Sequence, residues 1–170
     1  MRLLRSLLIV CVAIAVSGCA GYRLGPTDGQ TAGEKSVQIV PFANRTPEAR
    51  LADAVTSALR KEVQRDGTFH LGTHDAGDII VTGAILRYER REVSLLANDV
   101  ATAQDYNVSL TAQVTARERS SGKVLFDQPV TSRTLVRVTP DLPSSERQSL
   151  PLLATDLARR VTALLADGSW

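Results

Sequence analysis

One cysteine of this 170-residue sequence has the surroundings of a lipid-attachment site. Val16-Ser17-Gly18-Cys19 places an aliphatic residue and two small residues before the cysteine, which is the pattern of a bacterial lipobox. Small side chains let the chain lie extended in a peptidase cleft, and the Cys19 thiol can form a thioether with diacylglycerol. Two or three acyl chains hold a protein stably on a membrane, whereas one holds it only marginally. We therefore predict cleavage after Gly18 and a stable lipid anchor on Cys19.

The residues before Cys19 have the layout of an export signal, which we assign to residues 1–18. Arg2 and Arg5 form a basic start, and residues 7–16 form an apolar run that ends at two small residues. A membrane-spanning helix needs roughly twenty apolar residues, so this run suits export and removal. The alternative is an ordinary secretory signal that happens to end near a cysteine. Because Cys11 leaves with the signal, the mature chain has no second cysteine for a disulfide.

The remaining residue types give little indication of catalysis or metal binding. His70 and His74 have the spacing of two ligands on one helix face, but Gly72 and Gly77 indicate a turn there. The sequence has no glycine-rich phosphate loop and no Gly-x-Ser-x-Gly motif. We therefore expect no enzyme, no metal and no cofactor. An envelope hydrolase that uses ordinary carboxylates is the remaining enzymatic alternative.

Basic residues near the ends of the expected strands are candidates for binding an anion such as lipopolysaccharide. The guanidinium group of arginine makes paired hydrogen bonds to phosphate and carboxylate groups, and most basic residues of this chain are arginines. Glutamates lie among them, so a solvated rim of ion pairs is the alternative. The candidates are Arg90, Arg91, Arg117 and Lys123.

Composition indicates one globular domain without a strong overall charge. Removal of residues 1–18 leaves 170 − 18 = 152 residues, enough for a sizeable core. The mature chain has 20 − 2 = 18 basic and 18 acidic residues, which argues against nucleic-acid binding. We assign residues 19–36 to a tether and residues 37–168 to the domain. Within the tether, Tyr22 and Leu24 alternate with small or charged neighbours and could add a short edge element.

The first half of the domain reads as a strand, a helix and two further strands. Residues 37–42 form a β-branched run typical of a strand. Thr46 can cap a helix that starts at Pro47 and ends at Asp66-Gly67. Residues 68–71 are a possible short edge strand, and residues 79–88 are a central strand before a charged cluster. The apolar face of the helix consists of Leu51, Val55, Leu59 and Val63.

The second half predicts a hairpin and a helix. Residues 93–103 lack a clear period and are interpreted as a loop, and residues 106–116 alternate strictly as a half-buried strand does. The strand that follows contains Pro129, which indicates an edge or bulged strand. Pro151 indicates that the last helix begins close to Ser149 and runs to Asp167-Gly168.

These elements predict an α+β domain. Two amphipathic helices pack on one face of a four-stranded, mainly antiparallel sheet, in the order β-α-β-β-β-α with a possible extra short edge strand. The other face of the sheet then carries short, uncharged polar side chains. This face is either solvated or a docking surface for a polar partner such as a barrel lumen. Its residues on the alternating strand are Asn107, Ser109, Thr111, Gln113 and Thr115.

Several segments of the sequence together resemble the LptE family of lipopolysaccharide-assembly lipoproteins. They are the lipobox with Cys-Ala-Gly-Tyr-Arg-Leu at 19–24, Val-Pro-Phe-Ala-Asn-Arg-Thr-Pro-Glu at 40–48, Arg-Asp-Gly at 65–67, the long strand at 106–116 and Ser-Gly-Lys-Val-Leu-Phe at 121–126. The resemblance extends over most of the mature chain. It implies two helices against a four-stranded sheet, in agreement with the elements above.

The resemblance also implies a location and partners. Proteins of this family lie at the inner leaflet of the outer membrane, lodge inside the β-barrel protein LptD and help that barrel to fold. They help to place lipopolysaccharide in the outer leaflet, and some bind it directly. Ala20 after the lipidated cysteine fits outer-membrane sorting in the enterobacterial scheme. The alternative is a lipid-tethered periplasmic module that binds cell-wall or envelope glycan.

Overall fold

Three long antiparallel strands form the centre of the fold in the computed structural model, which describes residues 33–73, 76–93, 105–137 and 142–168. β4 (Ile79–Val93) pairs with β5 (Asp105–Glu118), and β5 pairs with β6 (Val124–Arg137). In β5, the alternate residues from Val108 to Ala116 are at most 1% exposed, because every second side chain points into the core. The strict alternation in the sequence is therefore confirmed as a long, half-buried strand.

Three short strands extend this sheet in parallel. β1 (Ser36–Ile39) lies parallel to both β4 and β3 (His70–Leu71), and β2 (Ala43–Asn44) pairs with β4 further along. The sheet has six strands in the order β3-β1-β4-β5-β6, with β2 on β4. The predicted sheet of four mainly antiparallel strands therefore has too few strands and lacks the parallel pairs that the structure contains. A helix connects β1 to β4, and such a crossover returns the chain parallel to where it began.

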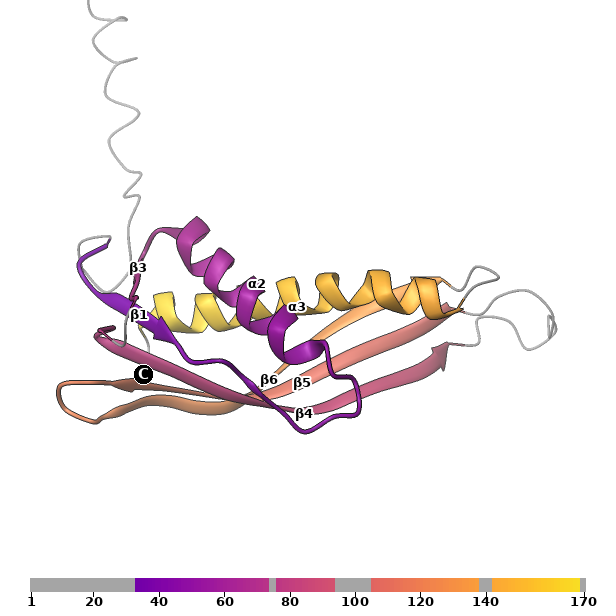
Figure 1. Cartoon of the computed structure of the whole chain (residues 1–170), viewed down its shortest axis with the longest axis horizontal. Helices are drawn as coiled ribbons and strands as arrows, with labels where there is room; N and C mark the ends of the chain where they lie inside the picture. The colour runs from indigo at the N-terminus through magenta and orange to yellow at the C-terminus, as the bar shows by residue number, and fades with distance from the viewer. Residues whose placement is uncertain (1–32, 74–75, 94–104, 138–141, 169–170) are drawn as a thin grey trace, which may run out of the picture.

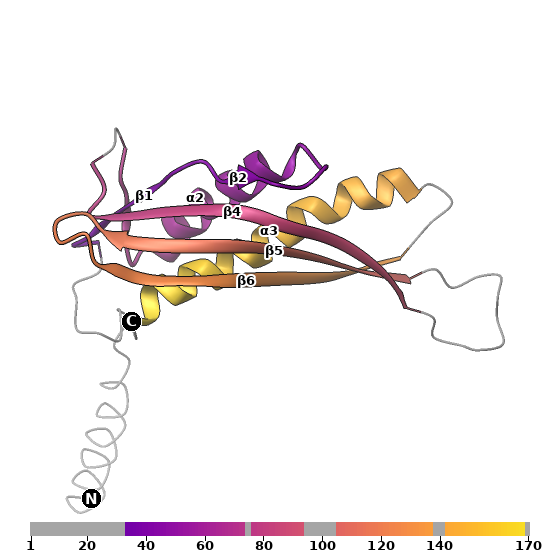
Figure 2. The same ribbon diagram turned by 90° about the horizontal axis from the view of Figure 1, so that it is seen from below.

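Both helices cover the same face of the sheet, as predicted. α2 (Leu51–Asp66) and α3 (Leu142–Asp167) pack against each other, and α3 also packs on β5 and β6. Figures 1 and 2 show the two helices on one side of the long strands, with no described element on the opposite side. The core fills the space between these layers. None of the described helices combines the length and the apolar character that a membrane span requires.

The first helix begins later than the sequence predicts. α2 starts at Leu51, and Arg50 occupies the capping position without a side-chain hydrogen bond. The Thr46 hydroxyl donates to Asn44 Oδ1 at 2.8 Å, so it does not cap the helix. The Asn44 side chain also donates to the Glu48 carbonyl at 2.7 Å, which stabilises a turn where a first helical turn was expected. The end is as predicted, since Gly67 has a φ of 77° in the left-handed region.

Two other boundaries also differ from the predictions. α3 begins at Leu142 and continues through Pro151, although proline removes a helical hydrogen bond. Burial of Leu150, at 6% exposure, stabilises the turn next to that proline. β4 does not end before the charged cluster, because its residues as far as Val93 pair with the first half of β5. Pairing with a neighbouring strand outweighs the poor strand propensity of the charged residues.

Two expectations about the sheet edges are confirmed. The short edge strand exists as β3, and the strand that contains Pro129 is the edge strand β6. β6 also has an irregular register opposite Ala116 and Arg117. Cys19, residues 20–32 of the expected tether and most of the expected loop at 93–103 lie outside the described residues.

Candidate functional site

The helix-free face of the sheet presents a band of short polar side chains along β5. Asn107, Ser109, Thr111, Gln113 and Thr115 all lie on this face, because they alternate with the buried residues of β5. Four of the five are only partly exposed, while Asn107 is exposed. The residues that the sequence singled out as a possible docking face therefore share one surface.

Hydrogen bonds between strands order part of this band. Thr111 Oγ1 lies 3.0 Å from Thr131 Oγ1 on β6. Asp127 on β6 accepts hydrogen bonds from Gln113 Nε2 at 2.6 Å and from Thr115 Oγ1 at 3.0 Å. These contacts hold short side chains in place, so a partner that docks here would cost them little additional conformational entropy. The hydrogen-bonded part of the band is an ordered polar surface.

The helix-free face is also hollowed near the far end of β4. The hollow has a volume of about 600 Å³ and extends across β4, β5 and β6. Its polar floor contains Asn107, Ser109, Thr111 and Thr131. The remaining residues that line it are Leu86, Arg87, Glu89, Arg91, Pro129 and Arg133.

Arginines border this hollow on two sides. Arg87 and Arg91 come from β4, and Arg133 comes from β6 on the other side of the polar floor. Two strand spacings, about 10 Å, separate these strands. Glu89 is the one carboxylate in the lining, so three arginines and one glutamate leave a formal charge of +2. The Arg91 guanidinium lies 3.7 Å from the Glu89 carboxylate, an exposed pair that contributes little energy. The geometry suits phosphate or sugar-acid groups.

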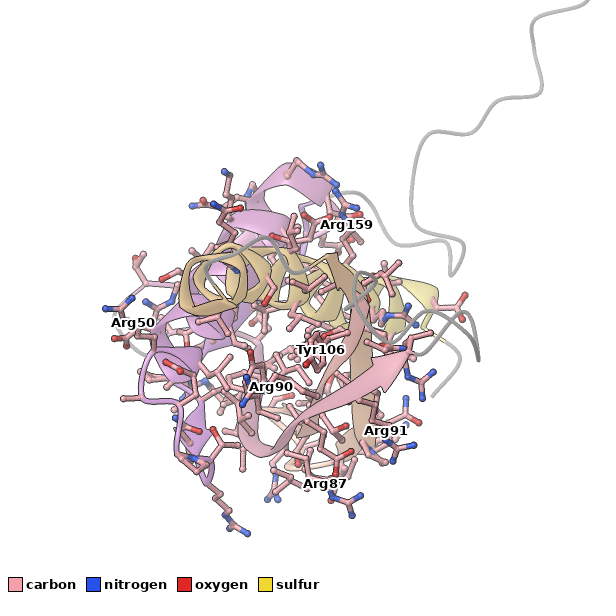
Figure 3. All side chains as sticks on the ribbon, turned by 90° about the vertical axis from the view of Figure 1, so that its right-hand side faces the viewer. Arg50, Arg87, Arg90, Arg91, Tyr106 and Arg159 are labelled. Carbon is pink, nitrogen blue, oxygen red and sulfur yellow. The ribbon has the colours of Figure 1, made fainter. Side chains whose placement is uncertain are left out.

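A bulge in β4 decides which of its charged residues face this hollow. The register shifts between Ile85 and Arg87, so Arg87 lies opposite Thr111 on the helix-free face. If β4 continued through Leu86 without a bulge, strict alternation from the buried Ile85 would direct Arg87 toward the helices. Figure 3 shows Arg87 and Arg91 on the side of the sheet away from the helices, whereas Tyr106 lies between the sheet and α3.

The structure does not bring the four basic candidates together. Arg90 lies opposite the buried residue Val108 and is therefore on the helix side of the sheet. Arg117 lies on the helix-free face at the other end of β5, opposite Val124, and Lys123 is in the hairpin turn beside it. About ten residues of strand, roughly 33 Å, separate that end from Arg91. Only Arg91 of the four borders the hollow.

Arg133 borders the hollow, but the sequence did not single it out. Its position follows from the register of the β5–β6 hairpin, which places it opposite Ser109. The pairing of β5 with β6 cannot be counted outward from the Ser120-Ser121-Gly122 turn by simple alternation, because the register shifts between Ala116 and Arg117. That shift moves every later pair by one residue, so the sequence alone does not show that Arg133 lies opposite Ser109.

Exposed large apolar side chains are spread over the helix-free face. Among the described residues, four large apolar side chains are exposed: Leu86, Val124, Leu135 and Leu152. The first three lie on the helix-free face, and Leu135 is 62% exposed. Val124 and Leu135 lie opposite Arg117 and Asn107, at the two ends of β5, so these side chains do not form one contiguous apolar patch.

The structure places no metal-binding group at this face. Within the described ranges, no three His, Cys, Asp or Glu side chains are close enough to share a metal ion. His70 is exposed on β3 at a sheet edge. His74 lies outside the described residues.

Comparisons with known proteins agree with this architecture. The sequence model of the LptE family, described as lipopolysaccharide-assembly, matches residues 34–165. None of the curated proteins matches the sequence significantly. The solved structures supply similar folds at low identity.

Three of these structures illustrate the shared fold. A minor lipoprotein from Acinetobacter baumannii is 15% identical, with a TM-score of 0.52, and the alignment covers 78% of this chain and 92% of that one. A hypothetical protein from Chlamydia trachomatis is 13% identical with a TM-score of 0.57, over 79% and 98% of the two chains. PelC from Paraburkholderia phytofirmans, solved as a dodecamer, is 17% identical with a TM-score of 0.53, over 79% and 90%.

Proposed function

The chain belongs to the LptE, lipopolysaccharide-assembly, family, and from this membership we propose that it is a non-enzymatic outer-membrane lipoprotein that lodges in the LptD β-barrel. In this role it plugs the barrel, assists its assembly and helps lipopolysaccharide to reach the outer leaflet. The lipid on Cys19 holds it on the periplasmic side of the outer membrane.

The helix-free face is the observation that supports this proposal. Its ordered polar side chains match the polar lumen of a large barrel. The two helices cover the opposite face. We therefore assign the helix-free face to the barrel contact and the hollow with Arg87, Arg91 and Arg133 to an acidic part of lipopolysaccharide.

Crosslinking tests the barrel contact. A photoreactive residue at Asn107 or Thr82, both exposed on the helix-free face, should crosslink the detergent-solubilised, tagged protein to a large barrel protein. The same residue at Lys61 or Gln64, both exposed on α2, is the control and should give much less product. Reproducible recovery of the protein without any large barrel partner would contradict the proposal.

Charge reversal tests the hollow. The double variant Arg87→Glu/Arg133→Glu should weaken binding to purified lipopolysaccharide by about tenfold or more, equivalent to about 1.4 kcal/mol. The control Arg50→Glu/Arg159→Glu changes the charge by the same amount on exposed residues away from the hollow, as Figure 3 shows for Arg50 and Arg159. Equal weakening in both variants would show that only net charge matters.

The glycan-binding alternative rests on the same hollow. Its arginines would also suit the acidic groups of peptidoglycan, which carries carboxylates. A pull-down on purified peptidoglycan and on lipopolysaccharide separates the two functions. Retention on peptidoglycan alone, without a barrel partner, would favour the alternative.

A further inference from the structure

An open groove lies between α3 and β6, and it shares Pro129 and Thr131 of β6 with the lining of the hollow described above. It has a volume of about 740 Å³ and is lined by Thr68, by Gln128, Pro129, Val130 and Thr131 of β6, and by Arg160, Ala163, Leu164, Ala166 and Asp167 of α3. Most of the side chains from α3 are apolar. The groove therefore offers an apolar surface beside a strand.

The strand beside this groove is the long edge of the sheet. β6 has 14 residues, and no strand within the described ranges pairs with its outer side. The opposite edge strand, β3, has only two residues. A long unpaired edge is prone to pair with another chain, and native proteins usually cover such an edge.

The described chain begins at the rim of the same groove. The Gly33 N–H donates to the Thr68 carbonyl at 2.9 Å, and Thr68 lines the groove. Figures 1 and 2 show the start of β1 and the end of α3 at the same end of the molecule. The residues immediately before Gly33 therefore enter the fold next to the groove.

We propose that the segment before Gly33, residues 20–32, covers this groove, with Tyr22 and Leu24 against its apolar lining. In an extended chain the side chains of Tyr22 and Leu24 point to the same side, and Arg23 points to the other. Leu24 is 33 − 24 = 9 residues from Gly33, and nine extended residues span up to about 30 Å. The segment thus has both the reach and the apolar residues that the groove requires.

This contact gives the tether a specific role. Cys19 is three residues before Tyr22, or about 10 Å of extended chain. A docked segment would keep the lipid close to the C-terminal part of α3 that lines the groove. The inference depends on lipidation of Cys19 but not on the proposed barrel partner.

Disulfide trapping in the full lipidated protein tests the contact. The thiol of Cys19 is used by the lipid and Cys11 leaves with the signal, so two introduced cysteines would be the only free thiols. Leu24→Cys with Ala163→Cys, in the groove, should oxidise several-fold faster than Leu24→Cys with Gln64→Cys, on the exposed face of α2 near Thr68. Equal rates would overturn the proposal.

Hydrogen exchange supplies a second readout that leaves the groove unchanged. Tyr22→Ser/Leu24→Ser should increase amide exchange in the β6 residues that line the groove by several-fold, whereas the control Arg23→Ser should not. Unchanged exchange in the double variant would overturn the proposal. So would disulfides that form mainly between protomers, which would assign the groove to a second copy. Protection of β6 that appears only when a barrel partner is added would overturn it as well.

Discussion

The carboxylate of Asp78 joins the start of β4 to the start of β1. Asp78 Oδ2 accepts hydrogen bonds from the Ser36 hydroxyl at 2.7 Å and from the Ser36 N–H at 2.8 Å. The Asp78 N–H in turn donates to Ser36 Oγ at 3.0 Å. The hydroxyl bond, followed by the backbone bond, lowers the pKa of Asp78 below the ordinary range of an aspartate, because both favour the charged form.

This shift predicts a pH-dependent contribution to stability. A carboxylate with a lowered pKa in the folded state stabilises the fold above the unfolded pKa, about 3.9. The contribution is lost as the pH falls through the lower folded pKa. Ser36→Ala should therefore raise the pKa of Asp78, and its destabilisation relative to wild type should be larger at pH 7 than at acid pH.

Carbon-13 NMR of the Asp78 carboxyl and urea unfolding at both pH values measure these effects. Ser57→Ala, on an exposed face of α2, is the matched control and should change neither quantity. The same destabilisation by Ser36→Ala at both pH values would mean that the Asp78 carboxylate does not contribute through this contact.

At the scale of elements, the segment between β1 and β2 runs beside β4 and packs a phenylalanine ring against a glycine of that strand. A Cβ atom on Gly83 would lie 2.2 Å from Phe42 Cε1, much closer than atoms can approach. Phe42 is 3% exposed, and its N–H donates to Thr56 Oγ1 of α2 at 3.1 Å. Gly83 thus allows the Phe42 ring to pack between the sheet and α2.

A double-mutant cycle tests this packing. Gly83→Ala should lower the free energy of unfolding by about 1–3 kcal/mol, because it overpacks the core. Phe42→Leu should also destabilise, but the double variant should lose less than the sum of the two, since the smaller side chain relieves the clash. Urea unfolding measures all three variants, with Thr82→Ala on the exposed face as a control. Strictly additive losses would contradict the contact.

The elements also explain why the helix-free face is uniform along β5 but changes character along β4. β5 alternates without interruption between Tyr106 and Ala116, so one face is apolar and the other polar throughout. In β4 the bulge after Ile85 reverses the alternation, and charged residues then face away from the helices. A single extra residue in β4 therefore separates outward-facing residues without charge from outward-facing charged residues along that strand.

At the scale of the whole molecule, we expect the domain and the proposed lipid anchor to have separable roles. The described core lies within residues 37–165, and the family match covers 34–165. Because these residues contain the described core, we expect the domain to fold without the lipid. The role that we propose for the lipid on Cys19 is to raise the effective concentration of the domain near a membrane partner.

This separation predicts the behaviour of an unlipidated protein. Cys19→Ala, supplied with an ordinary cleavable signal, should give a folded, soluble protein with an unchanged thermal midpoint. Recovery of a barrel partner should fall by roughly tenfold or more without being abolished, because only effective concentration is lost. Circular dichroism and quantitative co-purification check the two outcomes. An unfolded Cys19→Ala protein would show that the anchor is part of the fold.

The sequence by itself determined the two helices, the long alternating strand, the edge position of the strand with Pro129 and the end of α2 at Gly67. Each of these follows from local rules, because side-chain period, proline and glycine act over a few residues. The same alternation in the sequence placed five polar residues of β5 on one surface: Asn107, Ser109, Thr111, Gln113 and Thr115. The family resemblance, which the match over residues 34–165 confirms, rested on short segments of this kind.

Only the tertiary structure decided the six-stranded mixed sheet, the arginine-bordered hollow and the separation of Arg91 from Arg117. Parallel pairing of β1 with β4 joins residues about 40 positions apart, and no local pattern specifies that partner. The bulge in β4 and the irregularity in β6 each shift the register by one residue. Because one residue reverses the face of every later side chain, the arginines that share the hollow follow from strand pairing rather than from their spacing in the sequence.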